Sequence, residues 1–210
     1  MNEDVCERMN ESIDGMPGPD TNGYICTYTG VHFDFMNPTP EMVRIQDIAH
    51  ALALTNRWGG HTTQPSNVAQ HSLIVWRIIR DEFPGNLELQ LYALLHDAPE
   101  AYLPDMPAPM KKHLESFRMM DANIEEAIFE AFDVKIPDDF GRQCVKCADI
   151  EAYRWEARDL MHGASGVADP CMGDRPMYQL MPWQRAEEVF TQVLVELMSL
   201  VATKRADEVA

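Results

Sequence analysis

Apolar residues recur at the period of an α-helix through most of the chain beyond residue 44, and this pattern constrains the fold more than any other feature. The clearest stripe, near the C-terminus, consists of Trp183, Ala186, Phe190, Val193, Leu194, Leu197 and Val201. Residues at this spacing share one helix face, which the chain must bury against a neighbour. Core packing explains the stripe better than a dimer interface does. We therefore expect an all-α domain.

The same pattern sets the expected helices. We predict a short helix over 45–52, a longer one that begins after Ser66 or Asn67 as N-cap, and further helices over 87–96, 110–132, 139–162 and 183–203. On the second of these, His71 shares a face with Val68, Val75 and Ile78 and so points to the core side. Residues 163–182, rich in Gly, Pro and Met, are expected to form a loop that could cover part of the molecule.

The N-terminal region has a different composition. Residues 1–23 combine Gly and Pro with many acids, which predicts a flexible acidic leader that cannot bury enough apolar surface to fold. From Tyr24 to Phe35, β-branched and aromatic residues surround Thr29-Gly30, a pattern typical of a short β-hairpin. Pro38 and Pro40 end it. The expected organisation is the leader followed by a single domain over 24–205.

Charge and cysteine content exclude several classes of protein. Lys and Arg number 17 against 34 Asp and Glu, a formal charge of −17 that disfavours a nucleic-acid partner. No apolar run is long enough to span a bilayer and the first residues are acidic, so we expect a cytoplasmic protein without a membrane partner. The five cysteines do not suggest a disulfide framework. Cys144 and Cys147 form a C-x-x-C pair, which we interpret as small buried helix residues rather than metal ligands.

Four residues suggest a metal site on physical grounds: His71 on its apolar helix face, the adjacent His96-Asp97, and Asp149 on a helical face that it shares with apolar residues. Each histidine taken alone would more often be a hydrogen-bonded core residue. A carboxylate aimed at apolar neighbours, however, needs a compensating charge. A divalent cation bound by two imidazoles and two carboxylates would supply it, and such mixed ligands suit Mn, Fe, Co, Ni or Zn better than Ca.

The order of these residues, H…HD…D, resembles the HD-domain phosphohydrolase superfamily, an all-α fold that binds one divalent metal. The likeness extends to the segments 67–72 (NVAQHS), 94–100 (LLHDAPE), 105–111 (DMPAPMK) and 146–149 (KCAD), and to the pair Arg57-Trp58. Over about residues 45–160 the chain is similar to the bacterial HD-domain 5′-deoxynucleotidases and to the phage dATP triphosphohydrolases. The resemblance implies an HD-domain helical bundle.

The resemblance also implies a metal centre and a proton-transfer group. His71, His96, Asp97 and Asp149 match the ligands of one divalent transition metal, expected to be Co, Mn, Ni, Fe or Zn, with room for an additional Mg bound with the substrate phosphates. Glu100 matches the catalytic glutamate of the family, which handles the proton of the attacking water or of the leaving oxygen.

Further matches concern a small-molecule nucleotide substrate. Arg57 matches an arginine that clamps phosphate, and Lys111 and Lys146 match lysines that reach phosphates. Trp58 and Asp105 match the pair associated with the sugar: the ring stacks on it, and Asp105, counted here as catalytic as well as substrate-binding, accepts from the 3′-hydroxyl. These few cations lie beside the expected metal ligands in an otherwise acidic chain.

Two reactions fit this set of residues. We favour a dNTP triphosphohydrolase, with dATP as one candidate substrate, which releases nucleoside and triphosphate; the alternative is a 5′-deoxynucleotidase that releases phosphate from dNMPs. The loop from Gly59 to Pro65 is short and glycine-rich, which motivates the first choice, and its His61 is expected to cap a turn. Alarmone hydrolysis lacks support in the Arg57-Trp58 and Asp105 matches. A non-catalytic nucleotide-binding module is the remote alternative, and a homo-oligomer is left open.

Overall fold

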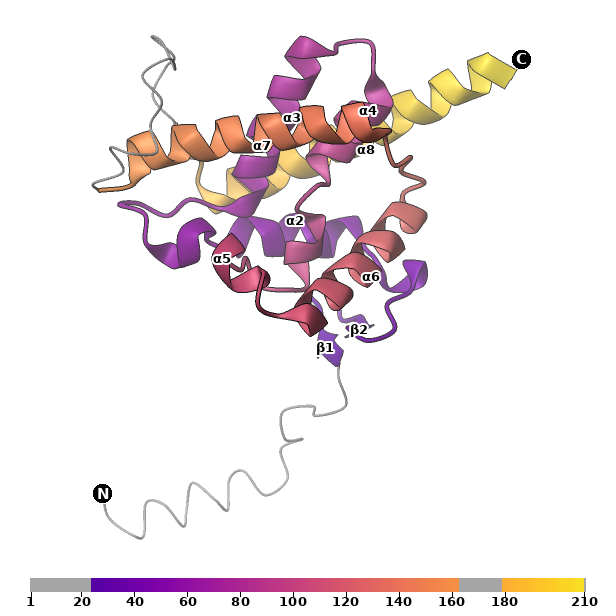
Figure 1. The fold of residues 1–210 in the computed structure, drawn as a ribbon. Helices are drawn as coiled ribbons and strands as arrows, with labels where there is room; N and C mark the ends of the chain where they lie inside the picture. Colours follow the sequence, from indigo (N-terminus) through magenta and orange to yellow (C-terminus); the bar gives the residue numbers. More distant parts are fainter. Residues whose placement is uncertain (1–23, 163–178, 210) are drawn as a thin grey trace, which may run out of the picture.

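The structure is a computed structural model that describes residues 24–162 and 179–209, and it is an all-α bundle with one small hairpin (Figure 1). The predicted leader at 1–23 and most of the predicted loop at 163–182 lie outside the described residues. In chain order the elements are β1 (Tyr24–Cys26), β2 (His32–Asp34), η1 (Pro40–Met42), α2 (Ile45–Leu54), η2 (Arg57–Gly60), α3 (Val68–Glu82), α4 (Leu87–Leu94), η3 (Ala98–Ala101), α5 (Ala108–Lys111), α6 (Glu115–Ala131), α7 (Asp139–Leu160) and α8 (Trp183–Val209).

The predicted hairpin is present and fastened to the bundle. Strands β1 and β2 are antiparallel, with Ile25 opposite Phe33. The Phe33 ring is fully buried and stacks on Tyr102, with 3.8 Å between ring centroids. Asp47 of α2 accepts hydrogen bonds from the turn between the strands: from the Thr27 hydroxyl at 2.9 Å, and from the Thr29 amide and hydroxyl at 2.7 and 2.8 Å.

The core is formed where α2, α3, α4 and α8 pack together, with α7 lying across α3 and α4 (Figure 1). The stripe on α8 is buried from Ala186 to Val201, whereas Trp183 at the start of the helix is 40% exposed. Core packing therefore accounts for the stripe. A second apolar cluster joins α3 to α7 through Val75, Ile79 and Val145. It fixes α7 against α3, the helix that carries His71.

Helix boundaries differ from the prediction in three places. The single helix expected over 110–132 is two, α5 and α6, because the apolar residues that suggested continuity are exposed: Met110 by 54% and Leu114 by 40%. Helix α4 ends at Leu94, so His96 and Asp97 lie in the turn before η3 rather than on the helix. Helix α8 continues to Val209.

The interpretation of Cys144 and Cys147 as buried residues is wrong for Cys147. Both lie on α7, but Cys144 is half-buried and Cys147 is exposed. They line a groove of about 680 Å³ between α3 and α7.

Among residues 24–162 and 179–209, every helix is too short or too polar to cross a membrane. A cytoplasmic location and self-association stay predictions from the sequence.

Candidate active site

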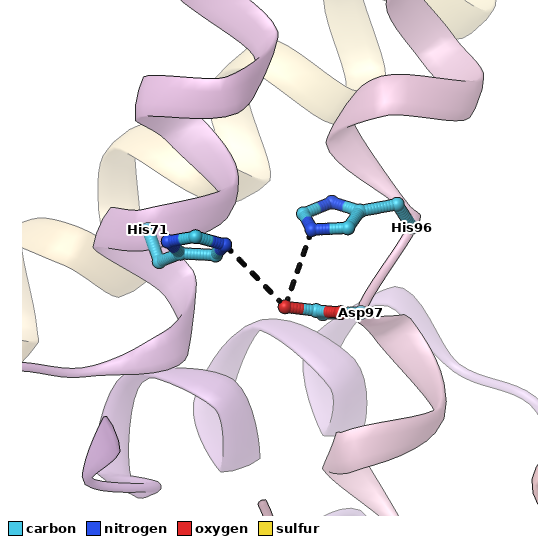
Figure 2. Close-up of side chains that lie close together, drawn as sticks. All are labelled: His71, His96 and Asp97. Carbon is cyan, nitrogen blue, oxygen red and sulfur yellow. Dashed lines mark ion pairs between the residues drawn. The ribbon is translucent and has the colours of Figure 1, made fainter. Parts of the chain in front are cut away.

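The four predicted metal residues converge from three parts of the chain. His71 lies in the first turn of α3, which is capped by the Asn67 side chain accepting from the Gln70 amide at 2.9 Å. His96 and Asp97 come from the turn after α4, and Asp149 comes from the middle of α7. Figure 2 shows both imidazoles turned towards one Asp97 oxygen. The fold thus brings together residues as far apart in the sequence as His71 and Asp149, which are separated by 78 positions.

The donor atoms are close enough to share one ion. His71, His96 and Asp97 offer ligand atoms that all lie within 4.8 Å of one another. Asp97 Oδ2 lies 3.2 Å from His96 Nε2 and 3.6 Å from His71 Nε2, and Asp149 Oδ1 lies 3.2 Å from His71 Nε2. His71, His96 and Asp97 therefore face a common centre, and Asp149 lies beside it against His71.

Hydrogen bonds orient both imidazoles. Nδ1 of His96 bonds the Ala93 carbonyl at 2.9 Å, and Nδ1 of His71 bonds Glu156 Oε1 at 2.9 Å. The two Nε2 atoms are buried and have no hydrogen-bond partner within the described part of the chain. Unsatisfied buried nitrogens that face carboxylates are what a metal site without its ion presents. The residues present thus fit a divalent transition metal.

Electrostatics at this centre are strong. Burial and Arg57 would lower the pKa of His71, but Glu156 and Asp149 raise it to about 9. Burial would raise the pKa of Asp97, but His96, His71 and Arg57 hold it well below its usual range. Burial likewise opposes ionisation of Asp149, whose pKa is nevertheless lowered by its histidine neighbours. Both carboxylates are therefore ionised and available to a cation.

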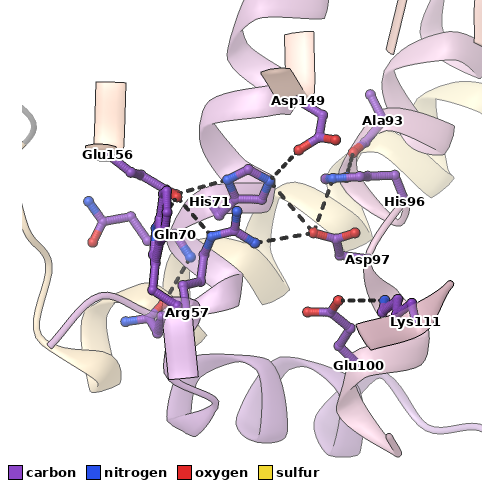
Figure 3. Close-up of polar contacts among 12 residues, drawn as sticks. Arg57, Gln70, His71, Ala93, His96, Asp97, Glu100, Lys111, Asp149 and Glu156 are labelled. Carbon is purple, nitrogen blue, oxygen red and sulfur yellow. Dashed lines mark hydrogen bonds and ion pairs between the residues drawn. The ribbon is translucent and has the colours of Figure 1, made fainter. Parts of the chain in front are cut away.

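Glu156, which the sequence analysis did not single out, is the main addition from the structure. Its side chain is fully buried on α7, and it accepts from Arg57 Nε at 2.9 Å and from Trp58 Nε1 at 3.1 Å in addition to its bond with His71 (Figure 3). Glu156 is seven positions after Asp149, and residues seven apart share one helix face. That spacing was a signal from which it could have been found.

The Arg57-Trp58 loop has an uncommon backbone. Trp58 has φ of 59° and Gly59 has φ of 58°, a left-handed conformation that is rare for a bulky residue. Such a residue costs about 1–3 kcal/mol and persists only when its surroundings hold it. The indole stacks on Tyr153 with ring centroids 4.4 Å apart and donates to Glu156. His61 is exposed and ends the turn, with its amide donating to the Trp58 carbonyl.

Glu100 is buried in η3 beside the group formed by His71, His96, Asp97 and Asp149, which we call the metal cluster. Its Oε1 accepts from Lys111 Nζ at 3.2 Å, and its Oε2 is buried without a hydrogen-bond partner among the residues described. Burial, and then the nearby Asp97 and Asp105, raise the pKa of Glu100 to about 8. Burial also raises the pKa of Asp105, which Arg57 opposes. A carboxyl group with such a pKa is suited to transfer protons near neutral pH.

Lys146, the last predicted residue, lies at the outer side of the cluster. Its ammonium is 2.6 Å from Asp149 Oδ2, and its side chain is 63% exposed. Both lysines thus lie against carboxyl groups of the site, and Figure 3 shows the pair of Lys111 with Glu100.

Comparison with known proteins agrees with this geometry. The sequence model of the family described as 5′-deoxynucleotidase YfbR-like matches residues 46–165. The chain belongs to the YfbR-like 5′-deoxynucleotidase family. An uncharacterised protein of Rhodobacter capsulatus is 36% identical over 151 residues, which cover 69% of this chain and 76% of that protein. The uncharacterised protein YfdR of Escherichia coli is 34% identical over 137 residues, or 65% of this chain and 72% of YfdR.

Membership of the YfbR-like family identifies the chain as an HD-domain hydrolase, a metal-dependent nucleotide phosphohydrolase. The match covers the segments that supply the metal cluster, Glu100 and Arg57, whereas the hairpin and α8 lie outside it. The family description names the monophosphate reaction. It thus supports the 5′-deoxynucleotidase alternative better than the triphosphohydrolase favoured from the sequence, and gives dATP no specific support.

Proposed function

We propose that the protein is a metal-dependent 5′-deoxynucleotidase that hydrolyses deoxynucleoside monophosphates to deoxynucleoside and phosphate. The observation that carries this proposal is the convergence of donor atoms from His71, His96 and Asp97, with Asp149 3.2 Å from His71, beside the buried Glu100. A binding module would not need a buried carboxyl group with a raised pKa at that place.

His71, His96, Asp97 and Asp149 would hold the ion, which we expect to be Co, Mn, Ni, Fe or Zn. When bound, such an ion supplies Lewis acidity, which lowers the pKa of a water molecule and neutralises charge on the phosphoryl group. The remaining steps belong to the side chains of this chain.

Glu100 is the proposed catalytic residue. Its Oε2 atom has no hydrogen-bond partner among the described residues, and its pKa is raised to about 8. At neutral pH it can therefore carry the proton that the leaving 5′-oxygen needs, or take one from the attacking water. Lys111, bonded to Oε1, fixes the orientation of the carboxyl group.

Arg57 and Trp58 are proposed to bind the substrate. The Nε of Arg57 is committed to Glu156 and its NH1 atom lies 3.6 Å from Asp97 Oδ2, so the terminal nitrogens of the guanidinium group are beside the metal cluster. There they can donate to phosphate oxygens. Trp58 has Tyr153 on one ring face, and we assign the other face to the deoxyribose. We assign to Asp105 the acceptor for the 3′-hydroxyl.

The pairing of the lysines favours a monophosphate. The ammonium of Lys111 lies 3.2 Å from Glu100, and that of Lys146 lies 2.6 Å from Asp149. Each ammonium group is thus already engaged by the carboxyl group of a neighbouring side chain. A triphosphate would bring two further charged phosphates into a region without a free cation among these residues, whereas a monophosphate needs only Arg57 and the ion.

The test is a product analysis by chromatography. The purified protein is incubated with Co²⁺, Mn²⁺ or Mg²⁺ and with dNMPs, dNTPs and their ribose counterparts. We expect nucleoside and orthophosphate from dNMPs, and loss of turnover in Arg57→Ala. Nucleoside with intact triphosphate from dNTPs would instead establish the triphosphohydrolase, with an additional Mg²⁺ as the natural companion of the phosphates. No turnover with any metal would refute both.

A further inference from the structure

Glu156 connects two parts of the site that are otherwise separate. Its Oε1 bonds Nδ1 of His71, a residue of the metal cluster, at 2.9 Å. Its Oε2 receives both Arg57 Nε at 2.9 Å and Trp58 Nε1 at 3.1 Å. The carboxylate thus lies between the imidazole on one side and the guanidinium on the other (Figure 3), and the indole shares the oxygen that binds the guanidinium.

The chemistry of these contacts fixes the form of each partner. Arg57 Nε and Trp58 Nε1 can only donate, and a glutamate paired with a buried guanidinium is a carboxylate, which only accepts hydrogen bonds. His71 must then keep a hydrogen on Nδ1, which leaves Nε2 as the atom that faces the cluster. Arg57 must present Nε to Glu156, which turns its terminal nitrogens towards Asp97.

We propose that Glu156 is a positioning residue that orients side chains in both halves of the site: His71 in the metal-binding half, and Arg57 and Trp58 in the substrate-binding half. The part of the inference that concerns substrate binding rests on the proposed function, whereas the part that concerns metal binding depends only on His71. One oxygen selects the His71 tautomer that can bind an ion. The other holds Arg57 and the strained Trp58 in the orientation that receives a nucleotide. Loss of this single carboxylate should therefore disturb both halves.

The substitution Glu156→Gln tests the bridge because an amide cannot replace it. The amide has one acceptor oxygen and one NH₂ donor group, whereas all three partners of Glu156 are donors. If the amide oxygen faces Arg57 and Trp58, which together bring two donors, the NH₂ group faces His71. His71 must then accept at Nδ1 and carry its hydrogen on Nε2, the tautomer that cannot bind an ion.

The matched control is Glu187→Gln. Glu187 of α8 bonds Nδ1 of His50 at 3.2 Å, so the control removes a carboxylate from the same imidazole atom outside the site. Two quantities are measured for each folded protein: Mn²⁺ or Co²⁺ affinity by calorimetry without substrate, and KM and kcat for a dNMP. A role limited to folding would lower the melting temperature of Glu156→Gln without changing metal affinity at a temperature where the protein is folded.

We expect metal affinity to fall about 10- to 100-fold in Glu156→Gln, the usual effect of losing a group that orients a histidine ligand, while Glu187→Gln matches the parent. KM should rise as well. If Glu156→Gln does not fold, Glu156→Asp is measured instead; it keeps the charge, shortens the reach, and should show the same losses to a smaller extent.

The outcomes separate this inference from the proposed function. If the parent binds metal but hydrolyses no dNMP, the proposed function fails, and a loss of metal affinity in Glu156→Gln still supports the role of Glu156. If the parent hydrolyses dNMPs and the variant has the parent's metal affinity and KM, the bridge is refuted while the function stands. Equal losses in Glu187→Gln would also overturn the inference, because they would show a general effect on folding.

Discussion

Asp47 and Glu156 are both buried carboxylates, exposed by 2% and 0%, and they are held in different ways. The partners of Asp47 are two hydroxyl groups and one backbone amide from a single turn, Thr27 to Thr29. The partners of Glu156 are an imidazole, a guanidinium and an indole from two distant segments. Neutral donors from one loop fasten the hairpin to the bundle. Donors that themselves bind ions and phosphates indicate a functional site.

The largest predicted effect is a loss of turnover in a variant whose stability does not change. Glu100→Gln removes the proton-transfer group but leaves the metal cluster, so turnover should fall about 100- to 10,000-fold, or about 2.7–5.5 kcal/mol in barrier. Initial rates with a dNMP and metal content after dialysis measure the two effects. Parental turnover in this variant would contradict the role assigned to Glu100, and Glu187→Gln serves as the control.

Asp47→Ala should show the opposite pattern. It removes three hydrogen bonds, from the Thr27 hydroxyl and from two Thr29 groups, and a typical hydrogen bond contributes about 0.5–1.5 kcal/mol to stability. We expect the free energy of unfolding in urea to fall by about 3 kcal/mol, with metal affinity unchanged. If metal affinity falls in the folded variant, the hairpin contributes to the site and the contrast breaks down.

Metal removal should destabilise the protein by a comparable or smaller amount. An ion at 100 times its dissociation constant stabilises the folded state by about 2.7 kcal/mol, so a chelator should lower the melting temperature by about 5 °C or more. In Asp149→Ala, which lacks one carboxylate of the cluster, the difference with and without chelator should shrink. Identical melting curves of the parent in both conditions would argue against an ion at this centre.

The smallest effect concerns a carboxylate that is partly exposed. Burial would raise the pKa of Glu88, but hydrogen bonds from Arg205 and Lys135 lower it. A lowered folded-state pKa stabilises the protein above the unfolded value of about 4.3, and that stabilisation is lost as pH falls through the folded value. Arg205→Met should cost about 0.5–1 kcal/mol at pH 7 and less near pH 3.5. An equal cost in urea unfolding at both pH values would assign it to packing.

The helical period predicted most of the fold, and its failures have physical reasons. The break between α5 and α6 carries no Gly or Pro, and the apolar spacing runs through it, so only the exposure of Met110 and Leu114 reveals it. The frequent burial of cysteine misled the interpretation of Cys147, because this residue lies in an open groove between α3 and α7 that leaves it exposed.

The sequence predicted the motif residues of the site better than the residues that orient them. Motif order predicted four metal ligands and Glu100, and the structure brings His71, His96 and Asp97 close enough to share an ion. Glu156 was missed since its partners lie 85 to 99 positions earlier, and a single glutamate on a helix reads as a solvated surface residue. The ion pairs of Lys111 and Lys146 likewise depend on tertiary packing that no spacing reveals.

Gln70, next to His71, has a consequence for how this chain can vary. Its side-chain amide donates to the backbone carbonyl of Gln179 at 2.7 Å and accepts from the backbone amide of Met181 at 2.8 Å. Gln70 thus binds the segment before α8 through backbone atoms alone. Hydrogen bonds to backbone atoms do not depend on which side chains those residues carry. Mutations at the exposed position 179 can therefore accumulate without loosening α3, the helix that carries His71, whereas the side chain of Met181 packs against the core and is constrained.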